Sequence, residues 1–308
     1  MLGARLLCGR LPAVERRRAA LERERLFKVI DRISSSPPDA AINEDAVGAT
    51  MSAAWAIDGA TGVSDRPPLV VGTTDAAWLA GELNAALHAA FDRPDAELEP
   101  ALAGVEAKLR ADFLAVDRQP GTPAGEQPTA ALAVAALRGE ALHLIGIGDC
   151  RIIHEQPTGE VGEFNPSAIG PAEALIVAER RRLMTQYPGE DPWPRLKAFI
   201  RPLRERANQE GGYSVVHPTR SWRTRVVRQT RERRKIRRLL VLSDGLYRLV
   251  DVFSVVTAAG LMQAAVAKGL SRLYAELRAL EDADRDCSKY PRVKTYDDAS
   301  GILIALNG

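Results

Sequence analysis

The chain has 308 residues, of which 46% are hydrophobic and 27% are charged, and its formal net charge at pH 7 is +2. This length and composition can bury a sizeable core, as one large domain or two small ones, and predict a soluble globular protein. No run of about 18 uninterrupted apolar residues exists, which argues against a transmembrane helix.

The N-terminal segment and the cysteines both give information on the cellular compartment of the protein. Residues 1–27 are rich in Arg but interrupted by Glu, and they lack the apolar core and cleavage site of a secretory signal. Cys8, Cys150 and Cys287 are odd in number and far apart, so neither a disulfide framework nor a thiolate zinc site is indicated. We expect a cytoplasmic protein with reduced thiols.

Hydrophobic periodicity predicts alternating groups of strands and helices. A solvated, Arg-rich helical extension is expected over residues 1–25, followed by one domain over 26–308. The predicted strands are 26–33, 53–57, 129–137, 141–147, 151–155, 236–242 and 301–306. The predicted helices are 79–91 with Thr74 as its cap, 98–116, 172–186, 195–208, 255–268 and 271–280. Residues 166–220 are less regular, and we interpret them as an inserted flap.

The stretch from Arg220 to Arg238 contains much of the positive charge of the chain. It could attract phosphate or a nucleic-acid backbone. However, no aromatic side chains are interleaved with the Arg residues beyond Trp222, so a base-stacking platform is absent. We favour a solvated basic face on a strand or hairpin over a nucleic-acid contact.

Acidic turns stand beside four of the apolar strands. They are Asp58-Gly59, Gly148-Asp149, Ser243-Asp244-Gly245 and Asp297-Asp298. Each one alone is typical of an ordinary turn. Carboxylates placed repeatedly at strand ends would repel one another unless a cation compensates them, and hard divalent cations prefer such an all-oxygen set.

The order of these motifs adds a resemblance. The segments Asn43-Glu44-Asp45, Asp58-Gly59, Gly148-Asp149-Cys150-Arg151, Ser243-Asp244-Gly245 and Asp297-Asp298-Ala299-Ser300 resemble, in this order, those of bacterial members of the metal-dependent protein phosphatase 2C family. The resemblance implies an α+β fold, a four-layer α-β-β-α sandwich of two antiparallel sheets flanked by helices. It also implies a cytoplasmic signalling enzyme that hydrolyses phosphoserine and phosphothreonine on proteins, with two Mn²⁺ or Mg²⁺ ions at one edge of the sandwich.

The family pattern assigns roles to individual residues of this chain. Asp58 matches the carboxylate that bridges the two metals, and Gly59 matches the residue that lends a backbone carbonyl. Asp244 and Asp297 match the aspartates of the other metal site, and Asp149 matches the ligand of a weaker third ion in many members. Asp298 is expected to lie next to these ligands without binding a metal ion itself. The expected metal ligands are therefore Glu44, Asp45, Asp58, Gly59, Asp149, Asp244 and Asp297.

The resemblance also implies a mechanism. Two metal ions would lower the pKa of a bridging water and place hydroxide in line with the phosphorus, without a covalent phosphoenzyme. Asp58, Asp244 and Asp297 would act catalytically through that water. None of the three cysteines lies in the Cys-x5-Arg loop that a thiolate phosphatase needs.

Two positions depart from the family pattern. An Arg that clamps the substrate phosphate in many members is replaced by Ala40, and a His that follows Asp-Gly in some members is replaced by Ala60. Arg32, Arg66 or the basic stretch could supply the missing clamp. The alternative function is therefore a catalytically weak or inactive phosphatase-like module that binds or regulates.

The remaining aromatic and histidine residues carry little functional information. Trp55 is expected in the core, whereas Trp193 and Trp222 fall near or within the flap and could line a substrate groove. The four histidines are interpreted as surface or structural residues.

Overall fold

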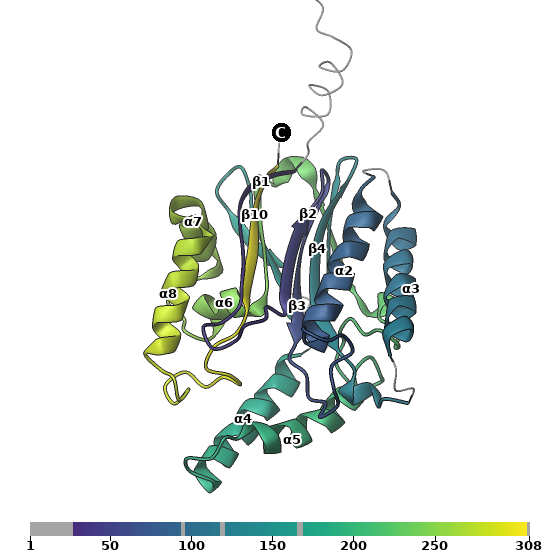
Figure 1. Ribbon diagram of the computed structural model, residues 1–308. Helices are drawn as coiled ribbons and strands as arrows, with labels where there is room; N and C mark the ends of the chain where they lie inside the picture. The colour runs from purple at the N-terminus through teal and green to yellow at the C-terminus, as the bar shows by residue number, and fades with distance from the viewer. Residues whose placement is uncertain (1–26, 94–95, 118–120, 165–168, 307–308) are drawn as a thin grey trace, which may run out of the picture.

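The computed structural model describes residues 27–93, 96–117, 121–164 and 169–306 of the chain. Two antiparallel sheets lie face to face, and helices cover the outer face of each sheet (Figure 1). This is the four-layer α+β arrangement that the resemblance implies, and that prediction is confirmed. The helical extension predicted over residues 1–25 lies outside the described residues.

Each sheet contains five strands. The first sheet has the order β1 (Phe27–Ser35), β10 (Ala299–Leu306), β9 (Arg238–Leu242), β6 (Arg151–Glu155) and β7 (Val161–Phe164). The second has the order β2 (Asp45–Ala49), β3 (Ala53–Ala60), β4 (Thr129–Arg138), β5 (Ala141–Ile147) and β8 (Val227–Glu232). Strands β2 and β7 were not predicted, because these short strands contain Gly and acidic residues and show no clear apolar alternation.

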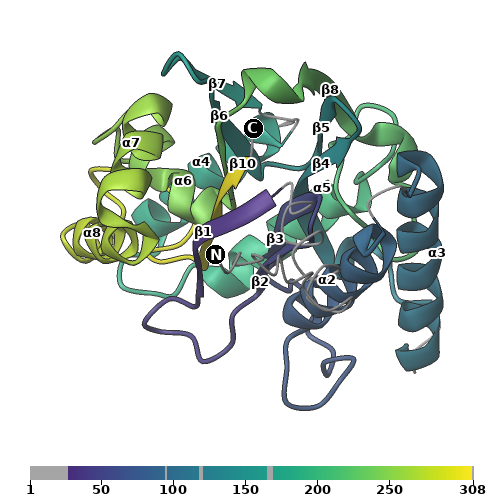
Figure 2. The same ribbon diagram turned by 90° about the horizontal axis from the view of Figure 1, so that it is seen from above.

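The helices form the outer layers (Figure 2). The second sheet is covered by α2 (Asp75–Phe91) and α3 (Leu98–Val116), and the first by α6 (Asp244–Asp251), α7 (Ala258–Lys268) and α8 (Leu270–Asp282). The predicted cap of α2 is present, since the Thr74 side chain accepts a hydrogen bond of 3.1 Å from the Ala77 amide. The eight-residue α6 was not predicted.

Two further helices stand apart from the layers. Helices α4 (Gly170–Gln186) and α5 (Trp193–Glu205) lie across one end of the two sheets (Figure 1). A small apolar cluster, which includes Val63, Leu183 and Leu196, holds them together and against the loop after β3. Every helix in the described ranges is too short or too polar to span a lipid bilayer.

The alternation of β3 explains how a carboxylate comes to lie between the sheets. Trp55 and Ile57 pack into the core under α2 and α3, whereas Ala54 and Ala56 pack into the core between the two sheets. Successive side chains of a strand point to opposite faces, so Asp58 follows the two alanines onto the inner face. It stands near the end of the strand, at the rim of the inter-sheet core.

Gly245 is required by the close approach of two chain segments. A Cβ at this position would lie 1.8 Å from the carbonyl oxygen of Asp298, which no side chain can tolerate without a backbone shift. By contrast, a Cβ at Gly104 on the exposed face of α3 would meet nothing within 4 Å.

We therefore expect Gly245→Ala to lower the free energy of unfolding by about 3 kcal/mol or more, as overpacking against backbone does. Gly104→Ala is the matched control and should stabilise α3 by up to about 1 kcal/mol. Urea denaturation followed by circular dichroism measures both values. Equal effects of the two substitutions would contradict the close approach.

Candidate metal centre

Asp45 and Asp58 face each other at the end of the second sheet. They are directly paired in the antiparallel register of β2 and β3. Beside them the Gly59 amide donates a hydrogen bond of 3.1 Å to the Glu44 carbonyl, and a Cβ at position 59 would lie 2.3 Å from that oxygen. Glycine at position 59 thus allows the acidic Glu44-Asp45 segment to approach Asp58.

The first sheet brings two more aspartates to the same place. Asp244 begins α6 directly after β9, and Asp297 precedes β10. Ser243 links the sheets at this point, because its hydroxyl donates to Asp45 Oδ2 at 2.7 Å and accepts from the Ser300 amide at 3.0 Å. The acidic ends of β2, β9 and β10 are therefore fixed relative to one another.

The aspartates interact strongly through their charges. Burial, and then the charges of Asp244, Asp45, Asp149 and Asp297, raise the pKa of Asp58 well above its usual value. Burial raises the pKa of Asp45 despite its hydrogen bond from Ser243, and burial and Asp244 raise that of Asp149. The structure thus brings together all five aspartates that the sequence analysis assigned as metal ligands.

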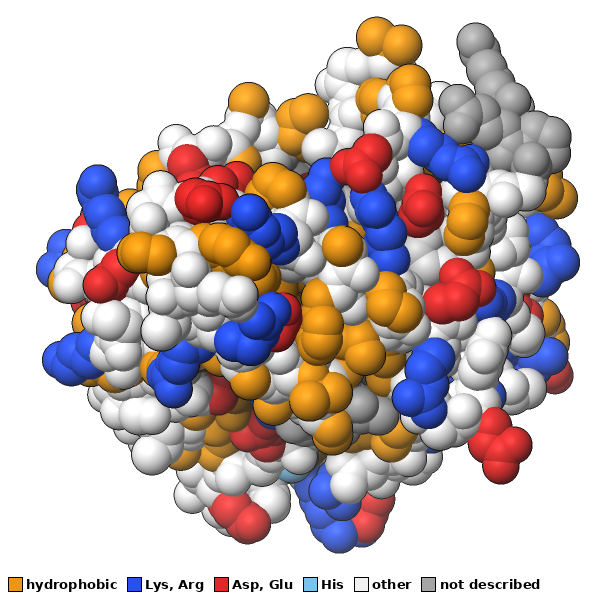
Figure 3. Space-filling model, turned by 90° about the horizontal axis from the view of Figure 1, so that it is seen from below, with side chains coloured by type: hydrophobic (Ala, Val, Ile, Leu, Met, Phe, Trp, Pro, Cys, Tyr) orange, Lys and Arg blue, Asp and Glu red, His pale blue; other side chains and the backbone are white. Residues whose placement is uncertain are grey.

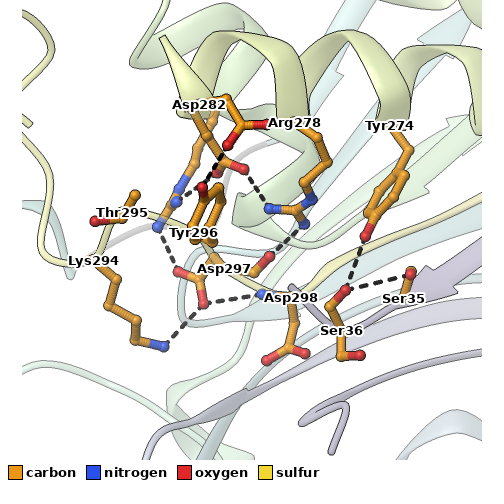
Figure 4. Close-up of polar contacts among 12 residues, drawn as sticks. Ser35, Ser36, Tyr274, Arg278, Asp282, Lys294, Thr295, Tyr296, Asp297 and Asp298 are labelled. Carbon is orange, nitrogen blue, oxygen red and sulfur yellow. Dashed lines mark hydrogen bonds and ion pairs between the residues drawn. The ribbon is translucent and has the colours of Figure 1, made fainter. Parts of the chain in front are cut away.

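Asp297 differs from the other aspartates because cations already contact it. Burial alone would raise its pKa, but Lys294 and Arg248 outweigh burial and hold the pKa below its usual value. Lys294 Nζ lies 2.9 Å from Oδ1 (Figure 4), and Arg248 Nη2 lies 2.5 Å from Oδ2. Arg248 also pairs with the fully buried Glu281 at 2.9 Å. Asp297 therefore stays ionised at neutral pH.

Glu44 belongs to a chain of polar contacts on the same side. The Thr61 hydroxyl donates to Glu44 Oε2 at 2.6 Å and accepts from Lys294 Nζ at 2.6 Å. Asp298 lies nearby and is buried; burial and the charge of Asp297 raise its pKa to about 6. The Lys294 ammonium thus bridges Asp297 and, through Thr61, Glu44.

The donor set fits hard divalent cations. It consists of carboxylates and backbone carbonyls, and two buried carboxylate oxygens, Asp45 Oδ1 and Asp298 Oδ1, have no hydrogen-bond partner. As the side chains stand, however, no three acidic, histidine or cysteine groups among the described residues are arranged to hold one ion. A cation would compensate the repelling aspartates, and on the Asp297 side it would compete with Lys294.

Two cavities meet at this centre. Asp58, Asp149, Asp244 and Asp297 line one of about 180 Å³, whose other wall comes from α4 and α5. Glu44, Asp298 and Ala40 line an adjoining cavity of about 700 Å³. The residues that line both are Thr61, Trp193, Val293, Lys294 and Asp297. Figure 3 shows the α4 and α5 side of the molecule, where hydrophobic side chains gather in the middle and Lys and Arg surround them.

Several predicted side chains lie elsewhere. Arg66 donates to Thr122 in a separate cavity, and Arg32 is exposed on β1. Trp193 lines the centre, but Trp222 is fully buried in the core under α2 and α3, so its predicted groove position is wrong. The basic residues that follow Trp222 in the sequence gave no indication that its side chain is buried.

The sequence analysis missed several residues of the centre. Arg248 stands four residues after Asp244 on a short helix, and Lys294 stands three residues before Asp297. Arg204 and Glu173 reach the smaller cavity from the flap helices α5 and α4, and burial followed by the charge of Asp244 raises the pKa of Glu173 to about 7. Only proximity in the chain to Asp244 and Asp297 could have indicated the first two.

We expect Asp58→Asn to stabilise the metal-free protein at pH 7.5. Because the pKa of Asp58 is raised in the folded state, ionising this carboxylate lowers the free energy of unfolding. The loss grows as the pH rises from the unfolded-state pKa of 3.8 through the raised folded-state pKa. Each kcal/mol gained should raise the thermal midpoint by roughly 2–4 °C. The gain should shrink as the pH falls toward 3.8. Asp112→Asn on α3 is the control, and a lower midpoint for Asp58→Asn would contradict the repulsion.

Lys294→Met should strengthen Mn²⁺ binding, because it removes a cation that competes for Asp297. The Lys294 side chain is 32% exposed, so the pair is worth ~1 kcal/mol and the gain should be about fivefold. Isothermal titration calorimetry measures the affinity, with Lys197→Met, which removes an ion pair to Asp65, as the control. Weaker Mn²⁺ binding in Lys294→Met would show that the ammonium does not compete.

Comparisons with known proteins bear on the fold. The sequence matches no family profile and no curated protein. The serine/threonine phosphatase PstP/Ppp from Mycobacterium tuberculosis is 18% identical with a TM-score of 0.57, and the alignment covers 92% of this chain and 99% of that one. A PstP catalytic domain in complex with two manganese ions is 18% identical with a TM-score of 0.56, and the alignment has the same coverage. Stp1 from Staphylococcus aureus is 14% identical with a TM-score of 0.52, and the alignment covers 91% of this chain and 96% of that one. The chain therefore has the fold of the bacterial serine/threonine phosphatases, as the sequence motifs indicated.

Proposed function

We propose that the chain is a metal-dependent phosphatase that hydrolyses phosphoserine and phosphothreonine on proteins. The observation that carries this proposal is the convergence of Asp58, Asp149, Asp244 and Asp297 from both sheets around one cavity. The fold supports it, because the solved structures that share it are serine/threonine phosphatases, one of them in complex with two manganese ions.

In this proposal Asp58 would help to hold both of two Mn²⁺ or Mg²⁺ ions. The Gly59 carbonyl, with Glu44 and Asp45, would help to hold one ion, and Asp244 and Asp297 would help to hold the other. When bound, the ions supply positive charge for the phosphoryl oxygens and a water of lowered pKa. Asp149, on the turn between β5 and β6, lines the same cavity as Asp58 and is a further carboxylate toward this centre.

The protein residues prepare the site for this charge. Asp45, Asp58 and Asp149 have raised pKa values, so cation binding should release protons from them. Ser243 orients Asp45 by its hydrogen bond, and Arg248 holds Asp297 ionised. Helices α4 and α5 close one wall of the cavity with Ile176, Trp193, Leu203 and other side chains.

We expect turnover of p-nitrophenyl phosphate and of a phosphothreonine peptide that depends on added Mn²⁺. Asp58→Asn should lower kcat by about 100-fold or more, since it removes a charge that holds both ions. Asp112→Asn, a surface carboxylate paired with Lys108, is the control and should keep parental activity.

The contrary result also has a defined meaning. Absence of metal-dependent turnover, with Asp58→Asn equal to the parent, would refute the proposed enzyme. If calorimetry then detected no binding of Mn²⁺ either, the chain would be a phosphatase-like binding or regulatory module.

A further inference from the structure

Arg204 presents a buried guanidinium nitrogen without a hydrogen-bond partner. The residue lies near the end of α5 and lines the smaller cavity together with Asp58 and Asp244. Its Nη2 donates to the Thr61 carbonyl at 2.9 Å, whereas its Nη1 is buried and contacts no acceptor. Burial lowers the pKa of Arg204, yet a guanidinium in a protein remains charged.

The other cations that line this cavity are already paired. Arg248 contacts Asp297 and Glu281, and Lys294 contacts Asp297 and the Thr61 hydroxyl. Among the described residues of the cavity wall, Arg204 is thus the cation with a buried nitrogen left unpaired. A buried donor without an acceptor is unfavourable, and an anionic ligand would supply the acceptor.

Arg201 shows what a purely structural Arg looks like on the same helix. It stands one turn before Arg204, and its Nε donates to the Val63 carbonyl at 2.8 Å while its Nη2 pairs with Asp65. Both residues hold the loop that follows β3. Arg201 forms an ion pair with a carboxylate of that loop, whereas Arg204 donates only to a neutral carbonyl there.

The position of Thr61 explains how Arg204 reaches the centre. Thr61 follows Asp58 by three residues, and it binds Arg204 through its carbonyl and Lys294 through its hydroxyl. Two cations from distant segments therefore meet at one residue on the rim of the aspartate cluster. An anion bound there would face Arg204 on one side and the metal centre on the other.

We propose that Arg204 binds the phosphoryl group of the substrate. This inference rests on the proposed function, because it assigns a binding residue to that reaction. Guanidinium groups suit phosphate oxygens, since their donors form a planar fork. The flap helix α5 would then contribute directly to substrate recognition.

The test compares Arg204→Met with Arg201→Met as the matched control. Arg204→Met should raise both the KM for p-nitrophenyl phosphate and the inhibition constant of inorganic phosphate about tenfold or more, since a charge-assisted hydrogen bond is lost. Mn²⁺ affinity by calorimetry should stay parental. Arg204→Lys should fall between the parent and Arg204→Met, because it keeps the charge but loses the fork.

A second measurement separates this inference from the proposed function. Binding of inorganic phosphate in the presence of Mg²⁺, followed by ³¹P line broadening, requires no turnover. Arg204-dependent phosphate binding in an inactive parent would uphold the anion site and refute the enzyme. Parental KM and phosphate binding in Arg204→Met would overturn the inference, as would equal losses in Arg204→Met and Arg201→Met, which would indicate a loosened helix.

Discussion

Repulsion among buried and half-buried carboxylates is the constraint on which the centre of this molecule depends. Asp45 and Asp58 are adjacent across two strands, and Asp149 and Asp244 act on the same group of charges. Packing of the two sheets forces these groups together, because each stands at the end of a strand whose other residues fill the core. The fold therefore stores an unfavourable electrostatic arrangement that a divalent cation can relieve.

The architecture holds this arrangement by contacts that tolerate little change. Gly59 and Gly245 each follow an aspartate and let another backbone carbonyl approach, that of Glu44 and that of Asp298. Ser243 then joins the two sheets through Asp45 and the Ser300 amide. Backbone packing and the Ser243 contacts thus bring together the chain segments that carry these carboxylates.

Much of this could be predicted from the sequence, because strand ends and Asp-Gly turns are local signals. The β4–β5 hairpin, the Thr74 cap and the order of acidic motifs identified the sheets and the aspartates. The cationic residues of the centre could not be predicted from such local signals. Arg204 comes from a helix that meets Asp58 only through tertiary packing, and Trp222 is buried although its neighbours are basic and exposed.

The cations around Asp297 make the centre asymmetric in charge. In this chain Lys294 and Arg248 compensate Asp297, so the two sides of the centre are unequal in charge. Asp297 is already compensated by these two cations, whereas burial and the charges of neighbouring aspartates raise the pKa values of Asp45 and Asp58. If two ions bind as proposed, the ion held by Asp297 would compete with an ammonium that already contacts this ligand.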